Sequence, residues 1–142
     1  MRSRRLPPLI ADVSADQDKK MNIIASFLTV EDSPPDLILA FAQSEDPIGG
    51  CKSLILMRTK KYEQFMYEFE HGVSIRWEDD VEEGEFDEII TSFEWNETQA
   101  IITSPKRIFE VDISDIPKDE FKAMKKVLKK MNSDNCFKLK KI

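Results

Sequence analysis

Residues 87–113, DEIITSFEWNETQAIITSPKRIFEVDI, contain three apolar runs at 87–95, 98–104 and 107–113, which short polar turns separate. In the last run Phe109, Val111 and Ile113 share one side, because successive side chains of an extended strand point to opposite faces. Asn-Glu and Ser-Pro pairs stand between the runs, and short connections of this kind join antiparallel neighbours. The stretch therefore predicts an antiparallel meander with one covered face.

Further strands are predicted on both sides of this meander. The first run of the chain, 22–30, is apolar on both faces, which favours a central strand. Prolines and glycines lie between the following runs, where they indicate turns, because proline cannot donate to a sheet ladder. Together these patterns predict strands at 22–30, 37–43, 52–59 and 73–77, and a short final strand within 136–142.

The segment 60–72, KKYEQFMYEFEHG, leaves two structures open. Four of its apolar residues follow the i, i+3, i+4, i+7 spacing of a helix, and Gly72 suits a helix end. The four are Tyr62, Phe65, Met66 and Phe69. We expect a short helix here, and a strand is the alternative.

The last strong pattern predicts a helix that begins near Pro117. Phe121, Met124, Leu128 and Met131 form an apolar stripe, and lysines fill the opposite side. Acidic residues occupy the first turn and lysines the later turns, as the helix dipole favours. The predicted fold is α+β: an antiparallel meander sheet of about five to seven strands, the C-terminal helix packed on one face, and one short additional helix at 60–72.

The length of 142 residues corresponds to about one domain, which we assign to 21–142. Residues 1–20 begin with basic residues but make a poor signal peptide, because two prolines and an aspartate interrupt the apolar stretch. They are interpreted as a disordered leader or as the product of a wrongly assigned start codon, with Met21 as the true beginning.

The net charge of −6 is unevenly distributed along the chain. Residues 21–104 carry five basic and eighteen acidic groups, a balance of −13, and residues 105–142 carry a balance of +5. An acidic body repels nucleic acid and attracts a basic partner, whereas pairing of the two regions in different copies would give a homo-oligomer. No apolar run approaches the ~20 residues of a membrane span, so no membrane association is expected.

Residues that commonly carry catalysis are scarce. His71 is the sole histidine, and Cys51 and Cys136 are too far apart for a metal or redox motif, so we expect reduced thiols in a cytoplasmic protein. Phosphate-binding glycine motifs and nucleophile motifs are absent from the sequence, and the acid-rich stretch lacks the ligand spacing of a calcium loop. The sequence therefore predicts a non-enzymatic protein with no catalytic residue, cofactor or metal site.

The segment 78–88 contains eight carboxylates and directly follows Trp77. One interpretation is a solvated loop that maintains solubility and prevents strand edges from pairing. The other is a binding surface, in which the carboxylates steer a basic partner and the tryptophan supplies an aromatic anchor. A core position of Trp77 is the alternative to the anchor. The candidate partner-binding residues are Trp77, Glu78, Asp79, Asp80, Glu82, Glu83 and Glu85.

Two stretches, FAQSEDPIGGCKSLILMRT at 41–59 and HGVSIRWED at 71–79, resemble immunity proteins of bacterial polymorphic-toxin systems. The matched features are the acid pair and glycine pair before an apolar strand that ends in Arg58, and a second strand that opens at Gly72. The resemblance implies a small cytoplasmic inhibitor that occludes a toxin. It also implies that the toxin can be a nuclease with a basic cleft, as many toxins of these systems are. The alternative is a structural or regulatory interaction module that binds a housekeeping partner or itself.

Overall fold

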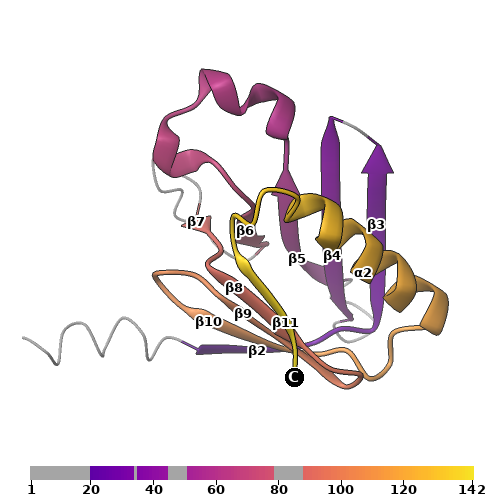
Figure 1. The fold of residues 1–142 in the computed structure, drawn as a ribbon. Helices are drawn as coiled ribbons and strands as arrows, with labels where there is room; N and C mark the ends of the chain where they lie inside the picture. Colours follow the sequence, from indigo (N-terminus) through magenta and orange to yellow (C-terminus); the bar gives the residue numbers. More distant parts are fainter. Residues whose placement is uncertain (1–19, 34, 45–50, 79–87) are drawn as a thin grey trace, which may run out of the picture.

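The three runs of the predicted meander form adjacent antiparallel strands (Figure 1). These are β8 (Ser92–Trp95), β9 (Gln99–Thr103) and β10 (Ile108–Asp112). Phe93 lies opposite Ile102, which in turn lies opposite Phe109, and all three side chains are fully buried. The alternating pattern therefore predicted the covered face of this region correctly. The computed structural model describes residues 20–33, 35–44, 51–78 and 88–142.

Two edge strands complete this meander sheet. β2 (Lys20–Ile24) runs parallel to β10, and β11 (Lys138–Lys141) runs parallel to β8. The strand order is β11-β8-β9-β10-β2. The predicted final strand is therefore confirmed. Strand β2 begins at Lys20, within the predicted leader 1–20, whereas residues 1–19 lie outside the described residues.

A second sheet, called here the β4 sheet, has the order β3-β4-β5-β6-β7 and is antiparallel throughout. Its strands are β3 (Phe27–Ser33), β4 (Asp36–Ser44), β5 (Cys51–Arg58), β6 (Ser74–Trp77) and β7 (Glu88–Ile89). Leu39, Leu56 and Ile75 lie opposite one another on three neighbouring strands and are buried. The strands predicted at 37–43, 52–59 and 73–77 are confirmed.

The predicted strand 22–30 is divided between the two sheets. The backbone N–H of Ala25 donates to the carbonyl of Asp112 in the meander sheet (2.9 Å), whereas the N–H of Ser26 donates to Ala42 in the β4 sheet (2.8 Å). The run is therefore two edge strands rather than one central strand. Its apolar character on both faces arises because its two halves contribute to a core that both sheets share.

The predicted strand 87–95 is divided in the same manner. The N–H of Ile90 donates to Val73 of the β4-sheet side (3.0 Å), and the N–H of Thr91 donates to Thr103 of the meander sheet (2.7 Å). Ile90, rather than Thr91, is the buried residue at this crossing. Consecutive amides thus pair with different sheets at both crossings, so that each crossing joins the two layers.

Helix α2 (Lys118–Met131) covers edge strand β3 and its neighbour β4 in the β4 sheet. The predicted stripe is confirmed, since Met124, Leu128 and Met131 are fully buried. Polar contacts fix the helix along edge strand β3. Glu120 Oε1 accepts a hydrogen bond from the backbone N–H of Leu28 (2.9 Å), and Lys130 Nζ forms an ion pair with Asp32 (2.7 Å).

The fold class is α+β, as predicted. The described residues form ten strands in two five-stranded sheets, more than the five to seven strands of the single expected sheet. The difference arises because two predicted strands are each split at a crossing. Among the described residues, no helix has the length and apolar character that a membrane crossing requires.

Candidate protein-interaction surface

The sequence-predicted site is only partly covered by the structure. Glu78 follows β6 and is exposed, and its Oε1 accepts a hydrogen bond from the backbone N–H of Ser53 (3.1 Å). The remaining predicted carboxylates lie outside the described residues. They are Asp79, Asp80, Glu82, Glu83 and Glu85.

Trp77 belongs to the hydrophobic core. It lies opposite Leu54 on β5, and only 7% of its surface is exposed. This position corrects the prediction of an exposed aromatic anchor, because a side chain that is packed among core residues is unavailable to a partner. The alternation of β6 explains the placement, since Ile75 and Trp77 point to the covered face while Arg76 is exposed.

Exposed aromatic side chains instead gather on the segment 60–72. The segment forms two 3₁₀ turns, η1 (Lys60–Phe65) and η2 (Glu68–Glu70), that extend beyond the β4 sheet (Figure 1). We call residues 60–70 the excursion. Among its side chains that the structure describes, four apolar ones are exposed and define the excursion surface: Tyr62, Phe65, Met66 and Tyr67. Phe65 is 79% exposed and Tyr67 is 66% exposed.

The short helix predicted at 60–72 is present, but as two 3₁₀ turns whose buried face differs from the predicted one. A regular amphipathic helix buries the face on which its apolar residues recur. Here Tyr62, Phe65 and Met66 from the predicted stripe are exposed, and the buried residue of η1 is Glu63. The apolar spacing in the sequence therefore marks an exposed surface rather than a core face.

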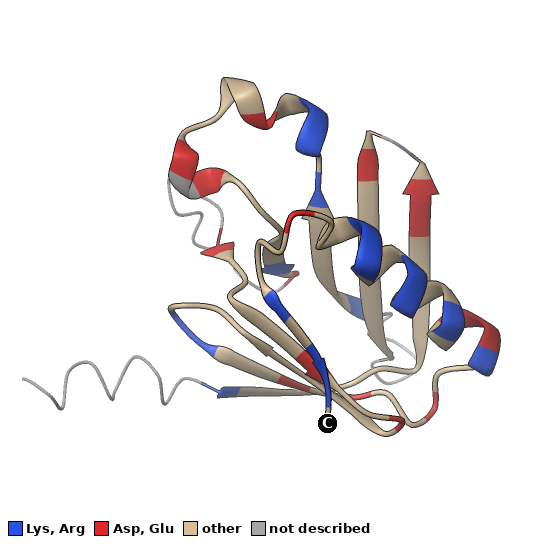
Figure 2. Ribbon diagram, viewed as in Figure 1, with Lys and Arg blue, Asp and Glu red and all other residues tan. Residues whose placement is uncertain are grey.

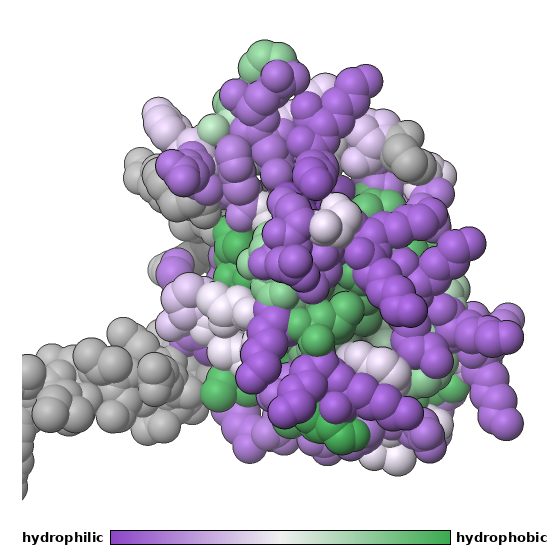
Figure 3. Space-filling model, in the orientation of Figure 1, coloured by the Kyte–Doolittle hydropathy of each residue, from purple (hydrophilic) through white to green (hydrophobic). Residues whose placement is uncertain are grey.

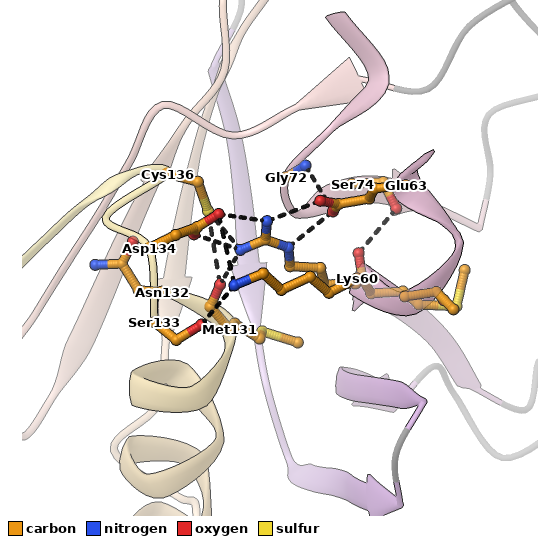
Figure 4. A network of polar contacts seen from close by, with 12 residues as sticks. Lys60, Glu63, Gly72, Ser74, Met131, Asn132, Ser133, Asp134 and Cys136 are labelled. Carbon is orange, nitrogen blue, oxygen red and sulfur yellow. Dashed lines mark hydrogen bonds and ion pairs between the residues drawn. The ribbon is translucent and has the colours of Figure 1, made fainter. Parts of the chain in front are cut away.

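A buried arginine explains why Glu63 is directed inward. The guanidinium of Arg58, at the end of β5, donates to both carboxylate oxygens of Glu63 (Nε···Oε2 2.8 Å, Nη2···Oε1 2.9 Å). It also donates to both oxygens of Asp134 (2.7 and 2.9 Å) and to the carbonyl of Met131 (2.7 Å). Figure 4 shows Glu63 and Asp134 on opposite sides of this network. Bidentate pairs of this geometry are among the stronger polar contacts in proteins.

The charged groups of this network stabilise one another. Hydrogen bonds from Arg58 lower the pKa of Asp134 well below its usual range and also lower the pKa of Glu63. Hydrogen bonds to Asp134 and Glu63 raise the pKa of Arg58 further above its ordinary value. Burial raises the pKa of the Cys136 thiol, which lies 3.2 Å from the guanidinium, so that this thiol stays protonated at neutral pH.

The same glutamate fixes both ends of the excursion. Glu63 Oε2 accepts a hydrogen bond from the N–H of Gly72 (3.1 Å), the residue that leads into β6. Gly72 has a φ of +115°, which L side chains rarely adopt, and an added Cβ would lie 3.1 Å from Ile89 Cγ2. Arg58, Glu63 and Gly72 together fix the points at which the chain leaves β5 and returns to β6.

Charges of both signs surround the excursion surface (Figure 2). Lys60 and Lys61 are exposed on η1, and Glu68 is exposed on η2. In the chain, the excursion joins β5 to β6, and the acid-rich stretch joins β6 to β7.

Glu88 differs from the solvated acids that the sequence predicts for 78–88. Its side chain is largely buried and forms an ion pair with Arg107 (2.9 Å). This ion pair connects β7 to the turn before β10. Ser104 donates a hydrogen bond to the same carboxylate. This residue therefore joins the two sheets.

The described residues contain no group of three or more His, Cys, Asp or Glu side chains that could hold a metal ion. Comparisons of the chain with protein-family models, with curated proteins and with solved structures find no match. The resemblance to immunity proteins therefore stays a prediction from the sequence.

Proposed function

We propose that this chain is a non-enzymatic cytoplasmic binding protein that neutralises a basic protein partner, a toxin domain, by covering it. The observation that carries the proposal is the cluster of exposed aromatic and methionine side chains on an excursion that a buried ion-pair network holds in place. The identity of the partner as a toxin comes from the resemblance of 41–59 and 71–79 to immunity proteins.

The residue types of the excursion surface support a protein interface. Tyr, Phe and Met are enriched in the central part of interfaces, where their large side chains lose water on binding. Tyr62, Phe65, Met66 and Tyr67 are each at least 40% exposed, so a partner reaches them without unfolding of the chain. The attachment through Arg58 and Glu63 reduces the entropy that binding must remove, because the segment is ordered beforehand.

The charge of the chain supports a basic partner. Residues 21–104 carry a balance of −13, and electrostatic steering of opposite charges raises association rates by about 10–10³. The carboxylates of 78–85 would steer the partner, whereas the excursion surface would supply the apolar contact. Binding of this kind blocks a basic cleft without any chemical step.

The test is co-expression of the chain with the product of its neighbouring gene, with cell growth and co-purification as measurements. We expect Phe65→Ser to weaken a purified complex about 30-fold or more, because a contact of this kind contributes ~2 kcal/mol. Phe27→Ser is the matched control, since Phe27 is 41% exposed on β3 and lies outside the excursion. Equal losses in both variants, or absence of any basic binding partner, would contradict the proposal.

A further inference from the structure

The second exposed feature of the fold is a groove between α2 and β11. It has a volume of about 590 Å³, within the range of ligand-binding sites. Its apolar part consists of Trp95, Leu128 and Leu139. Figure 3 shows hydrophobic surface between the hydrophilic side chains of this region. Five lysines complete the lining: Lys122, Lys125, Lys126, Lys129 and Lys141.

The lysines of this groove are crowded around one aromatic ring. Lys125 Nζ and Lys141 Nζ each lie 5.6 Å from the centre of the Trp95 ring, and Phe121 packs against the same ring at 5.5 Å. Both ammonium groups are thus held over the groove by cation–π contacts. The groove is therefore a positively charged site with an aromatic floor.

This crowding is unfavourable in the isolated molecule. Lys122 and Lys126 are four residues apart on α2, as are Lys125 and Lys129, and like charges at this spacing destabilise a helix. Lys130, outside the groove, forms an ion pair with Asp32. Within the described part of the chain, none of the five groove lysines has a carboxylate at ion-pair distance. An acidic occupant would relieve the repulsion.

The spacing of the lysines fits an extended acidic peptide. Residues four apart on a helix are displaced by about 6 Å along its axis. Carboxylates at alternate positions of an extended chain are about 6.6–6.8 Å apart. Strand β11 is the last strand of its sheet, so an extended segment beside it could also pair with its open edge.

We propose that this groove binds residues 79–87, DDVEEGEFD, of a second copy of the chain. This segment contains six carboxylates for the lysines, and Val81 and Phe86 are apolar residues for the floor of the groove. Strands β6 and β7, which flank it, lie at the opposite end of the β4 sheet from β3, which α2 covers. The contact is therefore head to tail: the acidic segment of one copy lies in the groove of the next copy. Each copy supplies one groove and one segment.

The proposal does not depend on the identity of a toxin. The first measurement is the molar mass of the full chain by light scattering at about 20 mM and about 500 mM salt, since screening shortens the Debye length several-fold over this range. We expect oligomers at low salt and monomers at high salt. Monomers under both conditions, or oligomers insensitive to salt, would overturn the proposal.

Charge reversal provides the decisive test. Lys125→Glu/Lys141→Glu should abolish the oligomer, and so should Asp79→Lys/Asp80→Lys/Glu82→Lys/Glu83→Lys. An equimolar mixture of the two variants should oligomerise again, because the reversed segment then meets the reversed groove. The matched control is Lys118→Glu/Lys140→Glu, which changes the same helix and strand outside the groove lining and should leave assembly intact.

Circular dichroism of each variant verifies that it is folded before assembly is measured. Failure of the mixed variants to assemble, when the wild-type chain does assemble, would overturn the proposed contact. An oligonucleotide that binds the wild-type chain but not Lys125→Glu/Lys141→Glu, in the absence of self-association, would assign the groove to another anion and overturn it as well.

Discussion

Arg58 shows how one residue connects three parts of the chain. Its side chain is 2% exposed at the end of β5, and its charge is balanced by Glu63 of the excursion and by Asp134 after α2. Removal of one partner from a buried ion pair leaves an uncompensated charge, which is more damaging than removal of both partners. Arg58 therefore contributes both to the stability of the fold and to the shape of the excursion surface.

We expect Arg58→Met to lower the free energy of unfolding by about 3–5 kcal/mol, because it leaves the Glu63 carboxylate buried without its partner. The double variant Arg58→Met/Glu63→Leu should recover at least half of that loss. Urea unfolding of both variants measures the difference. A loss under ~1 kcal/mol for the single variant would show that water replaces the arginine, and that the ion pair does not hold the excursion.

The same network predicts a dependence of stability on pH. The pKa values of Glu63 and Asp134 are lower in the folded chain than their ordinary values. Their contribution is therefore fully present above the unfolded pKa values of about 4 and is lost as pH falls through the lower folded values. Urea unfolding from pH 7 to pH 2 should show this decline, and Glu63→Gln/Asp134→Asn should flatten it. An unchanged slope in the variant would assign the decline to other carboxylates.

Little of this network is visible in the sequence. An arginine that ends an apolar strand reads as a surface residue, and the carboxylates that pair with it lie five and 76 positions away. The lysine face of α2, in contrast, could be predicted from helical spacing alone, because all of its residues lie within one short segment of the chain. The features that were missed depend on pairing between residues far apart in the chain, whereas the features that were predicted depend on local spacing.

The elements of the fold divide in the same way. The meander and α2 were predicted correctly because their apolar period agrees with their final structure. The short helix predicted for the excursion is present as 3₁₀ turns, but its apolar side chains are exposed, because the tertiary contacts of Glu63 determine which face is buried. The two strand crossings were missed for a related reason. The run 22–30 was predicted as one strand with two apolar faces and 87–95 as one strand with one covered face, because the local pattern does not show where the backbone pairing changes sheet.

The whole molecule combines two sheets around one core with a marked division of charge. The acid-rich stretch follows β6 in the sequence. The lysine groove lies between α2 and β11, and Figure 2 shows Lys and Arg positions along both of these elements. Sequence composition revealed the division, but only the topology assigns the groove lysines to one surface. The arrangement suits the proposed action through contacts, because each charged region would attract an oppositely charged surface of another protein or of another copy.

The acidic stretch can be tested at this scale by reversal of Asp79, Asp80, Glu82 and Glu83 to lysine. We expect the melting temperature to stay nearly unchanged, because the sequence predicts a solvated loop here and charges in such a loop contribute within about ±0.5 kcal/mol. Association with a basic partner should slow by about 10–10³-fold at low salt, and the difference should shrink as salt screens the charges. Stopped-flow association and thermal unfolding measure the two effects separately. A large loss of stability would instead place these carboxylates in the framework of the fold and remove the electrostatic basis for partner binding.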